Sequence, residues 1–272
     1  MPEADQFTRF EHEGWQRVAG KYENAWSTLT RGFIPYLLKA VDIRSGQQIL
    51  DVACGPGYVS ELARNRGAKS VGVDFSGEMV RIARERNPEI DFFEGDAQDL
   101  NFDDDSFDCV VMNFGLLHLS RPETAFAEAR RVLRPGGRYA FTVWAGPEES
   151  PGAQLVENAV KAFANMNVQL PPGPDYFAYG DENECRHALA ATGFDSNSLS
   201  FETATVEWLV PSASHPFESE CQAGVRTAAL LAKQTPETLD KIKNQIEQSV
   251  LSYAKGDDFA VPFAAHVIAI SR

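Results

Sequence analysis

One stretch near residue 50 constrains the fold of this chain more than any other. Residues 49–60 read I-L-D-V-A-C-G-P-G-Y-V-S, an apolar run that stops at two glycines and continues in a helix-like pattern. Such a run predicts a buried β-strand, a tight turn and a helix. Gly55 and Gly57 let the backbone approach a ligand, and the helix directs its free N–H groups to the same place. The stretch therefore predicts a site for a nucleotide-like or carboxylate-bearing cofactor.

The hundred or so residues that begin at this stretch alternate between apolar runs and helix-like patterns. We expect strands at residues 48–53, 70–74, 90–94, 107–113 and 138–144. Because helices separate them, these strands should form a parallel, doubly wound sheet. Ligands of such sheets bind at the carboxyl ends of the strands. These ends should converge in space; they are residues 53–57, 74–75, 96–97 and 113–114.

The segments on either side of this core are expected to cover it. Residues 7–40 carry apolar side chains at helical spacing and predict helices that lie over the following domain. Later in the chain, residues 198–210 and 259–271 predict two long strands. Two helices, at about 213–233 and 236–254, would interrupt the hairpin between these strands and form a cap.

Net charge, hydropathy and cysteine spacing exclude several classes of function. The chain has 25 basic and 39 acidic residues, a net charge of −14, which opposes binding to nucleic acid. It has no apolar run long enough to span a membrane, and its first twenty residues lack the apolar core of a signal peptide. We therefore expect a cytoplasmic protein whose partner is a small molecule. The four cysteines have no metal-binding spacing and should be free thiols, so no metal site is expected; they are Cys54, Cys109, Cys185 and Cys221.

The glycine turn alone leaves the cofactor open. A dinucleotide-binding turn has a third glycine where this chain has Ser60. Asp74, at the end of the second expected strand, could accept from the ribose hydroxyls of a dinucleotide or of an adenosyl cofactor. Both readings remain possible at this point.

Four motifs in a fixed order resemble a known family. They read D-V-A-C-G-P-G, V-G-V-D-F-S-G-E-M, G-D-A-Q-D-L-N-F-D-D-D-S-F-D and R-V-L-R-P-G-G-R. With the late pair of strands, they are similar to the class I S-adenosylmethionine-dependent methyltransferases, and most similar to their UbiE-like branch of small-molecule methyltransferases. The resemblance implies S-adenosyl-L-methionine as the cofactor. The family often has a glycine at the position of Ala53, whose methyl group we expect only to shift the cofactor slightly.

Pattern and resemblance together predict the architecture. We expect an α/β fold with a doubly wound, mostly parallel, seven-stranded, Rossmann-like sheet, an antiparallel last strand and a helical cap. Residues 1–272 should form a single methyltransferase domain. Its expected parts are an N-terminal helical lid (1–45), a cofactor-binding core (46–145) and a substrate-side half (146–272), with the cap at about 211–255.

The resemblance also implies roles for the residues at the strand ends. Asp74 would bind the ribose, Asp96 and the Ala97 N–H would bind adenine, and the glycine turn would pass under the methionine arm. Asp51 would orient the turn or accept from the cofactor's ammonium, and Met79 would contact adenine or belong to the core. The implied cofactor-binding residues are Tyr22, Asp51, Ala53, Gly55, Gly57, Asp74, Phe75, Met79, Asp96, Ala97, Asn113 and Phe114.

The chemistry depends on the methyl acceptor. His118, just after the fourth expected strand, is the best candidate for a base, but a packed or capping role is the more common one for such a histidine. His12 and His215 are weaker candidates. Aromatic residues in the covering segments suit a small apolar or aromatic metabolite, so we expect O-methylation, or C- or N-methylation, in specialised metabolism. Two alternatives are an S-adenosylmethionine-binding protein without methyl transfer, pericyclase-like or regulatory, and a dinucleotide-dependent oxidoreductase.

Overall fold

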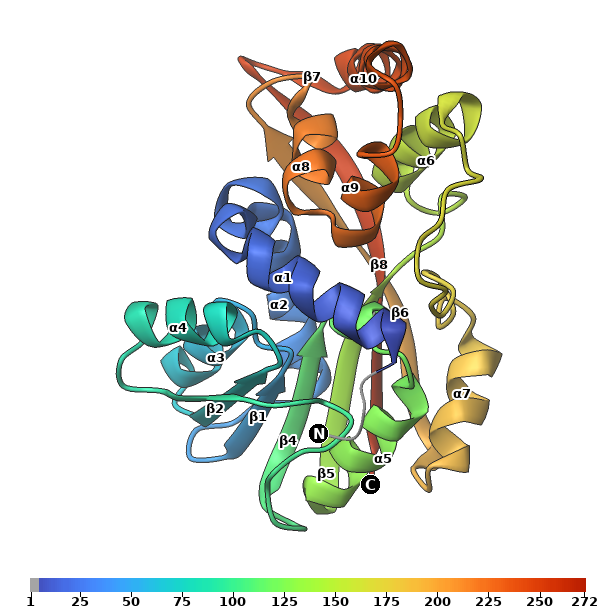
Figure 1. Ribbon diagram of the computed structural model, residues 1–272. Helices are drawn as coiled ribbons and strands as arrows, with labels where there is room; N and C mark the ends of the chain where they lie inside the picture. Colours follow the sequence, from blue (N-terminus) through green and yellow to red (C-terminus); the bar gives the residue numbers. More distant parts are fainter. Residues whose placement is uncertain (1–4) are drawn as a thin grey trace.

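A single mixed sheet forms the centre of the computed structural model, which describes residues 5–272 (Figure 1). Its strands are β1 (Gln48–Val52), β2 (Lys69–Asp74), β3 (Asp91–Glu94), β4 (Phe107–Asn113), β5 (Leu133–Trp144), β6 (Asp195–Val210), β7 (Ala254–Lys255) and β8 (Asp258–Ser271). Their order is β3-β2-β1-β4-β5-β8-β6, and the short β7 pairs with β8. Strands β1 to β5 are parallel, whereas β8 is antiparallel to both β5 and β6. The predicted α/β class, with a mostly parallel sheet and an antiparallel last strand, is confirmed. The sheet has eight strands instead of the predicted seven, because the two-residue β7 pairs with the start of β8.

Helices cover both faces of the sheet and continue beyond its carboxyl edge (Figure 1). They are α1 (Gln6–Ala25), α2 (Ser27–Ala40), α3 (Tyr58–Asn65), α4 (Gly77–Arg86), η1 (Leu116–His118), α5 (Pro122–Val132), α6 (Pro151–Phe163), α7 (Glu182–Ala191), α8 (His215–Ala223), α9 (Val225–Leu231), α10 (Pro236–Val250) and η2 (Leu251–Tyr253). Several begin at a polar cap. The Ser76 hydroxyl, for example, accepts from the Met79 N–H at 3.3 Å and begins α4.

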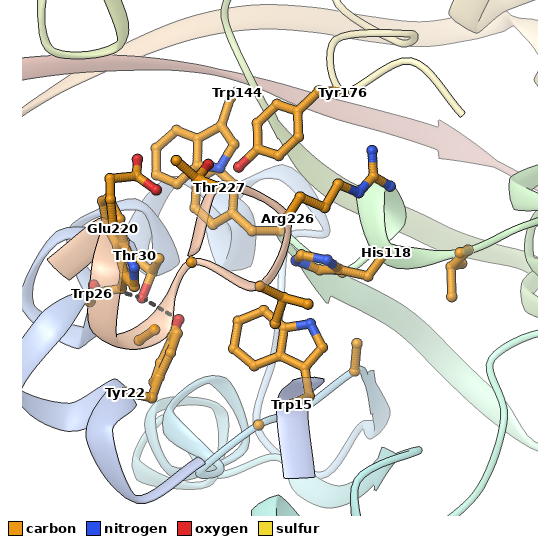
Figure 2. A pocket seen from close by; sticks show the side chains of 18 of the residues that line it. Trp15, Tyr22, Trp26, Thr30, His118, Trp144, Tyr176, Glu220, Arg226 and Thr227 are labelled. Carbon is orange, nitrogen blue, oxygen red and sulfur yellow. Dashed lines mark hydrogen bonds between the residues drawn. The ribbon is translucent and has the colours of Figure 1, made fainter. Parts of the chain in front are cut away.

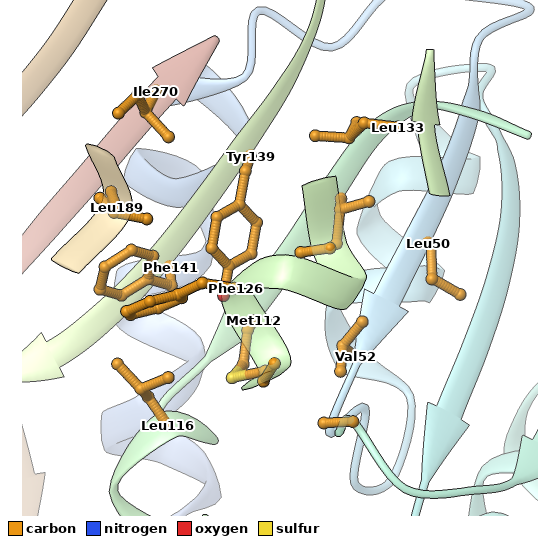
Figure 3. Packing of buried hydrophobic residues seen from close by; sticks show 14 of the residues in the cluster. Leu50, Val52, Met112, Leu116, Phe126, Leu133, Tyr139, Phe141, Leu189 and Ile270 are labelled. Atoms are coloured by element: carbon orange, nitrogen blue, oxygen red, sulfur yellow. The ribbon is translucent and has the colours of Figure 1, made fainter. Parts of the chain in front are cut away.

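Alternation of side chains along the strands builds a core on each face of the sheet. On one face, Leu50 and Tyr139 pack with Phe126 of α5 and Leu189 of α7 (Figure 3). On the other face, Ile49 of β1 packs against α2 and α3. Buried parallel strands that are apolar on both faces explain why the sequence pattern located them well.

The cap is carried by the two longest strands, β6 and β8. Both extend past the carboxyl edge of the parallel strands, and α8, α9 and α10 connect their far ends (Figure 1). Helix α10 packs on α6, and α8 packs on α1. The lid helix α1 therefore lies between the cap and the sheet edge at which the glycine turn stands.

Several boundaries differ from the sequence prediction, and two of these differences have a clear physical cause. The helix expected over 213–233 is two helices, because Gly224 adopts an extended backbone (φ −92°, ψ 98°) between α8 and α9. Glycine is a poor helix former, so this position is the weakest one in the segment. Strand β5 begins at Leu133 instead of Arg138, since Leu133 already pairs with Phe107 before a shift in register.

The structure also bears on the cysteines, on metal-binding groups and on membrane-spanning helices. All four cysteines are free, as predicted. Within residues 5–272, no group of three or more His, Cys, Asp or Glu side chains is placed to bind a metal ion. No helix in that range is long and apolar enough to cross a membrane.

Candidate active site at the carboxyl edge of the sheet

The turn after β1 has a left-handed backbone at three positions. Ala53, Gly55 and Gly57 have φ angles of 54°, 51° and 83°. A side chain at Gly55 would meet no atom within 4 Å, so this glycine borders open space, whereas one at Gly57 would lie 2.8 Å from the Phe92 ring. Gly55 therefore opens the turn toward a ligand, and Gly57 allows the turn to pack against β3. Ala53 is the strained residue of the turn, because its Cβ disfavours this conformation.

Asp74 joins the ends of β1 and β2. One carboxylate oxygen accepts from the Gly55 N–H and the other from the Ser76 N–H, each at 2.8 Å. The side chain is buried, and this burial raises the pKa of Asp74 to about 6 despite the two backbone donors. The remaining lone pairs of the carboxylate border the cavity described below.

Asp51 lies behind the turn. Its carboxylate accepts from the Ser60 N–H at 3.0 Å and from the Ser60 hydroxyl at 2.7 Å, which fastens α3 to β1. Burial raises the pKa of Asp51 to about 7. Its second oxygen, Oδ1, has no hydrogen-bond partner among the described residues. Asp51 and Gly57 are the two predicted cofactor residues that do not line the cavity.

A cavity of about 440 Å³ lies between the carboxyl edge of the sheet, the lid and the cap. It brings together the other predicted residues, from four strand ends and from α1 and η1: Tyr22, Ala53, Gly55, Asp74, Phe75, Met79, Asp96, Ala97, Asn113, Phe114 and His118. A side pocket of about 40 Å³ adjoins it at the glycine turn, between Tyr22, Gly55 and Asn113. Residues far apart in the sequence therefore converge at one edge, as in other parallel sheets.

Hydrogen bonds fix the polar groups around this edge. The Thr142 hydroxyl donates to Asn113 Oδ1 at 2.8 Å and accepts from the Phe114 N–H at 2.9 Å. Tyr22 and Thr30 share a hydrogen bond of 2.9 Å between their hydroxyls (Figure 2). The Phe114 N–H is therefore already engaged, and Asn113 is oriented by its neighbours.

Comparison with known proteins identifies the family. A family model described as methyltransferase domain matches residues 50–141. The demethylmenaquinone methyltransferase of Renibacterium salmoninarum is 36% identical over 66% of this chain and 82% of its own length. That of Paenarthrobacter aurescens is 34% identical over 60% of this chain and 66% of its own length. The chain belongs to the class I S-adenosylmethionine-dependent methyltransferases, in their UbiE-like branch. Its cofactor is S-adenosylmethionine, which settles the choice that the glycine turn had left open.

Solved structures agree with the fold of the methyltransferase. Phosphoethanolamine N-methyltransferase 2 of Haemonchus contortus, solved with S-adenosyl-L-methionine, has a TM-score of 0.60 at 18% identity, over 99% of this chain and 60% of that one. The [4+2]-cyclase SpnF has a TM-score of 0.55 at 18% identity, over 98% of this chain and 97% of that one. At such identities the likeness concerns the fold alone.

The cavity of the methyltransferase has two halves of different composition. One half, which we call the cofactor half because cofactor-binding residues predicted from the family resemblance lie in it, is formed by the strand ends and contains Ala53, Gly55, Asp74, Phe75, Met79, Asp96 and Ala97. The cap half is formed by the junction of α1 and α2, the end of β5, α6, the 165–180 segment and the α8–α9 region. It contains Trp26, Trp144, Val156, Val160, Tyr176, Phe177, Glu220, Thr227 and Leu230. Figure 2 shows Trp144, Tyr176, Thr227 and Glu220 on one side of the cavity and Trp15 and Tyr22 on the other.

A charged network connects the lid of the methyltransferase to its cap. Glu11 of α1 is fully buried, and its carboxylate bonds to His118 Nδ1 at 2.9 Å and accepts from Arg226 Nε at 2.8 Å. Arg226 also donates to the carbonyl oxygens of Leu117 and Pro174. Burial raises the pKa of Glu11, but His118 and Arg226 outweigh this effect and lower the pKa below its ordinary value. Glu11 is therefore ionised and orients the His118 ring.

His118 lines the cavity at the boundary of its two halves. The Trp15 ring packs edge-on against it, with centroids 4.8 Å apart. Its Nε2 makes no hydrogen bond to the described residues, so with Nδ1 bonded to Glu11 this is the ring nitrogen left without a partner. The weaker candidates lie elsewhere: His12 packs on Phe75, and His215 packs on Trp208.

Sequence reasoning missed five charged residues of the site, namely Glu11, Glu157, Lys161, Glu220 and Arg226. A signal was present for the first. Glu11 shares the buried face of α1 with Phe7, Gly14 and Val18, and a carboxylate on an apolar helix face needs a partner. Nothing in the sequence identified that partner, since Arg226 lies 215 residues away.

Proposed function

We propose that this methyltransferase transfers a methyl group to a small apolar or aromatic metabolite bound in the cap half of the cavity, with oxygen as the favoured acceptor atom. The observation that carries this proposal is the single cavity of about 440 Å³ that joins the glycine turn to an aromatic-lined cap. Aromatic walls suit a flat acceptor and exclude water from the reaction. Methylation of carbon or nitrogen fits the same cavity, and a role in specialised metabolism and a cytoplasmic location stay predictions.

The residues of the cofactor half fit S-adenosylmethionine. Asp74 would accept from the ribose hydroxyls, Asp96 would accept from the adenine amino group, and the Ala97 N–H, which has no partner among the described residues, would donate to the ring. Phe75 and Met79 would pack on the adenine faces.

The methionine arm would lie along the glycine turn. The side pocket offers space there between Tyr22, Gly55 and Asn113, beside the positive end of α3. Asp51 and Gly57 would act indirectly, by fixing the turn. Phe114 would contribute its ring, since its N–H is bonded to Thr142.

His118 would remove the proton of the acceptor. S-adenosylmethionine supplies the methyl group as the electrophile of an in-line displacement, and the protein supplies orientation. His118 Nε2 would take the hydroxyl proton as the oxygen–carbon bond forms and the carbon–sulfur bond of the sulfonium breaks, with S-adenosylhomocysteine as the leaving group. The ionised Glu11 would stabilise the resulting imidazolium through Nδ1. A carboxylate that orients a histidine in this way also fixes its tautomer.

The curated relatives support the class of acceptor. By name, they act on demethylmenaquinone, and a quinone is a flat, apolar ring system. The family model ends at residue 141, before the 165–180 segment and the cap. The segments that would contact the acceptor are therefore those for which the match says least.

Methyl transfer to a defined panel tests this proposal. The purified enzyme is incubated with S-adenosylmethionine and phenols, quinols or aromatic amines, and products are identified by mass spectrometry. We expect methylation of at least one phenol or quinol, and its loss in the His118→Asn variant. Binding of S-adenosylhomocysteine in a thermal-shift assay without methylation of any panel member would contradict a small aromatic acceptor, and stabilisation by NAD alone would contradict the cofactor.

A further inference from the structure

The cap half of the cavity contains one carboxyl group without a counter-ion. Four carboxyl groups line the whole cavity, and three of them have partners. Asp74 accepts from two backbone N–H groups, Asp96 accepts from the Gln98 N–H, and Glu157 pairs with Lys161. Glu220 of α8 has no ion pair and no backbone hydrogen bond among residues 5–272. Glu220 is half-buried in the cavity wall. A carboxylate in such a place without a counter-ion is unfavourable, so a ligand that supplies the missing charge would be stabilised there.

The position of this carboxyl is set by the break between α8 and α9. A Cβ placed on Gly224 would come within 2.5 Å of Glu220 Oε2. The carboxyl therefore lies directly over the Gly224 backbone, in space that any other residue at 224 would occupy. The backbone therefore holds the Glu220 carboxyl at a defined position in the cavity wall. The helix break, which the sequence did not predict, creates the space for it.

The nearby cations are committed to other groups. Arg226, two residues into α9, is bonded to Glu11 and to two backbone carbonyls. Lys161 of α6 pairs with Glu157 at 2.6 Å. Burial raises the pKa of Glu220 to about 7, and the Thr227 hydroxyl lowers it again in part. A cation brought by a ligand would meet a carboxyl that ionises readily at neutral pH.

The walls around Glu220 are aromatic. Trp144 stacks on Phe114 with centroids 3.9 Å apart, and Trp26 stacks on Trp208 with centroids 5.1 Å apart. Tyr176 lies beside Trp144 in Figure 2, with Glu220 on the same side of the cavity. Aromatic faces with a carboxylate form the usual environment for an organic ammonium group in proteins.

We propose that Glu220, with Trp26, Trp144 and Tyr176, binds a protonated amine of the methyl acceptor. The acceptor is then an aromatic molecule that carries a basic nitrogen at the end remote from the methylated atom. This proposal rests on the proposed function, because it places the acceptor in the cap half. It adds the substrate class, and it makes Glu220 a specificity-determining residue that touches the substrate.

A pair of probes of equal shape tests the amine site. Tyramine and 4-propylphenol differ only in that an ammonium group replaces a methyl group. Binding of each to the full chain saturated with S-adenosylhomocysteine is measured by calorimetry. We expect tyramine to bind about tenfold more tightly, the increment of one cation held by aromatic rings and a carboxylate.

Three variants locate the effect. Glu220→Gln keeps the shape of the side chain and should lower the affinity ratio of the two probes severalfold, since the carboxylate charge is lost and only the aromatic rings still attract the cation. Glu218→Gln, on the same helix but outside the cavity, should leave the ratio unchanged. In Gly224→Ala the new Cβ displaces the Glu220 carboxyl, and the affinity ratio should fall to a value between those of the wild type and Glu220→Gln. This variant provides an independent test if Glu220→Gln does not fold.

The outcomes separate this proposal from the function on which it rests. Equal affinity of the wild type for the two probes, no binding of tyramine, or a ratio retained in Glu220→Gln overturns the amine site. Binding of 4-propylphenol alone also overturns it but supports the apolar acceptor cavity. Failure of S-adenosylhomocysteine to bind would instead remove the proposed function itself.

Discussion

The two halves of the cavity are built in different ways. In the cofactor half, Asp74 is fixed by the N–H groups of Gly55 and Ser76, so the backbone of adjacent strand ends positions the side chain. In the cap half, side chains from several separate segments face one another, and Glu220 accepts no backbone hydrogen bond among residues 5–272. The shape of the cofactor half follows from the local β–turn–α units. The shape of the cap half depends on how the covering segments pack against one another. Such a division allows the acceptor site to change while the cofactor site stays the same.

The largest expected effect concerns His118, at the boundary of the two halves. Changing His118 to Asn should lower kcat by about 1,000-fold for a hydroxyl acceptor, because a general base is lost. The Kd for S-adenosylhomocysteine should stay the same. Steady-state kinetics with the best acceptor of the panel gives kcat, and calorimetry gives the Kd for S-adenosylhomocysteine.

Glu11→Gln is the matched variant for this prediction. It keeps the hydrogen-bonding shape but removes the charge that stabilises the imidazolium, and kcat should fall by about tenfold. If both variants lose cofactor affinity as much as turnover, His118 is a packing residue and the boundary role is wrong.

Asp74 should show the opposite behaviour. Asp74→Ala removes two acceptors from the ribose site and should weaken S-adenosylhomocysteine binding by about 100-fold, the worth of two charge-assisted hydrogen bonds. Calorimetry measures the affinity, and circular dichroism checks that the fold is intact. Asp74→Asn serves as the control for the backbone N–H groups of Gly55 and Ser76, because its amide can still accept from one of them. Unchanged affinity in both variants would refute the ribose role.

The same contrast explains how much of the structure the sequence could predict. Strands, the glycine turn and the residues around Asp74 follow from local patterns, since each β–turn–α unit is specified by neighbouring residues. Glu11, Arg226 and Glu220 could not be found in this way. The contacts of Glu11 and Arg226 join α1, η1 and α9 across more than a hundred residues, and which charge meets which depends on how the covering segments pack. The position of Glu220 depends instead on the helix break at Gly224. The helix break at Gly224 was missed because a single glycine inside a helical pattern is usually tolerated.

Asp51 should affect the fold rather than the ligand. Its folded pKa of about 7 exceeds the ordinary value of 3.8, so the folded state binds more protons between these values. Stability contributed by Asp51 is therefore greatest at low pH and falls as pH rises toward 7. Relative to wild type, Asp51→Asn should gain roughly 1 kcal/mol of unfolding free energy between about pH 5 and pH 6. Urea denaturation at the two pH values measures this, and a constant difference would show that the carboxyl is ionised throughout.

The smallest expected effect lies at Ala53. Its φ of 54° is left-handed, and its Cβ crowds the position that a side chain at Gly115 would take. Ala53→Gly relieves the strain, but the flexible glycine also loses more entropy on folding, so the net gain should be at most about 1 kcal/mol. Thermal melting measures it. A lower melting temperature would mean that the methyl group packs usefully in the turn.

The central claim is that one cavity seats the cofactor on the strand ends and leaves the aromatic cap half for the acceptor. A crystal structure of the enzyme with S-adenosylhomocysteine tests it most directly. The account predicts the adenosine against Asp74, Phe75 and Asp96, the amino-acid arm along the glycine turn, and no ligand density between Trp144, Tyr176 and Glu220. Adenosine density among those three residues, or a ligand bound away from the carboxyl edge of the sheet, would contradict it.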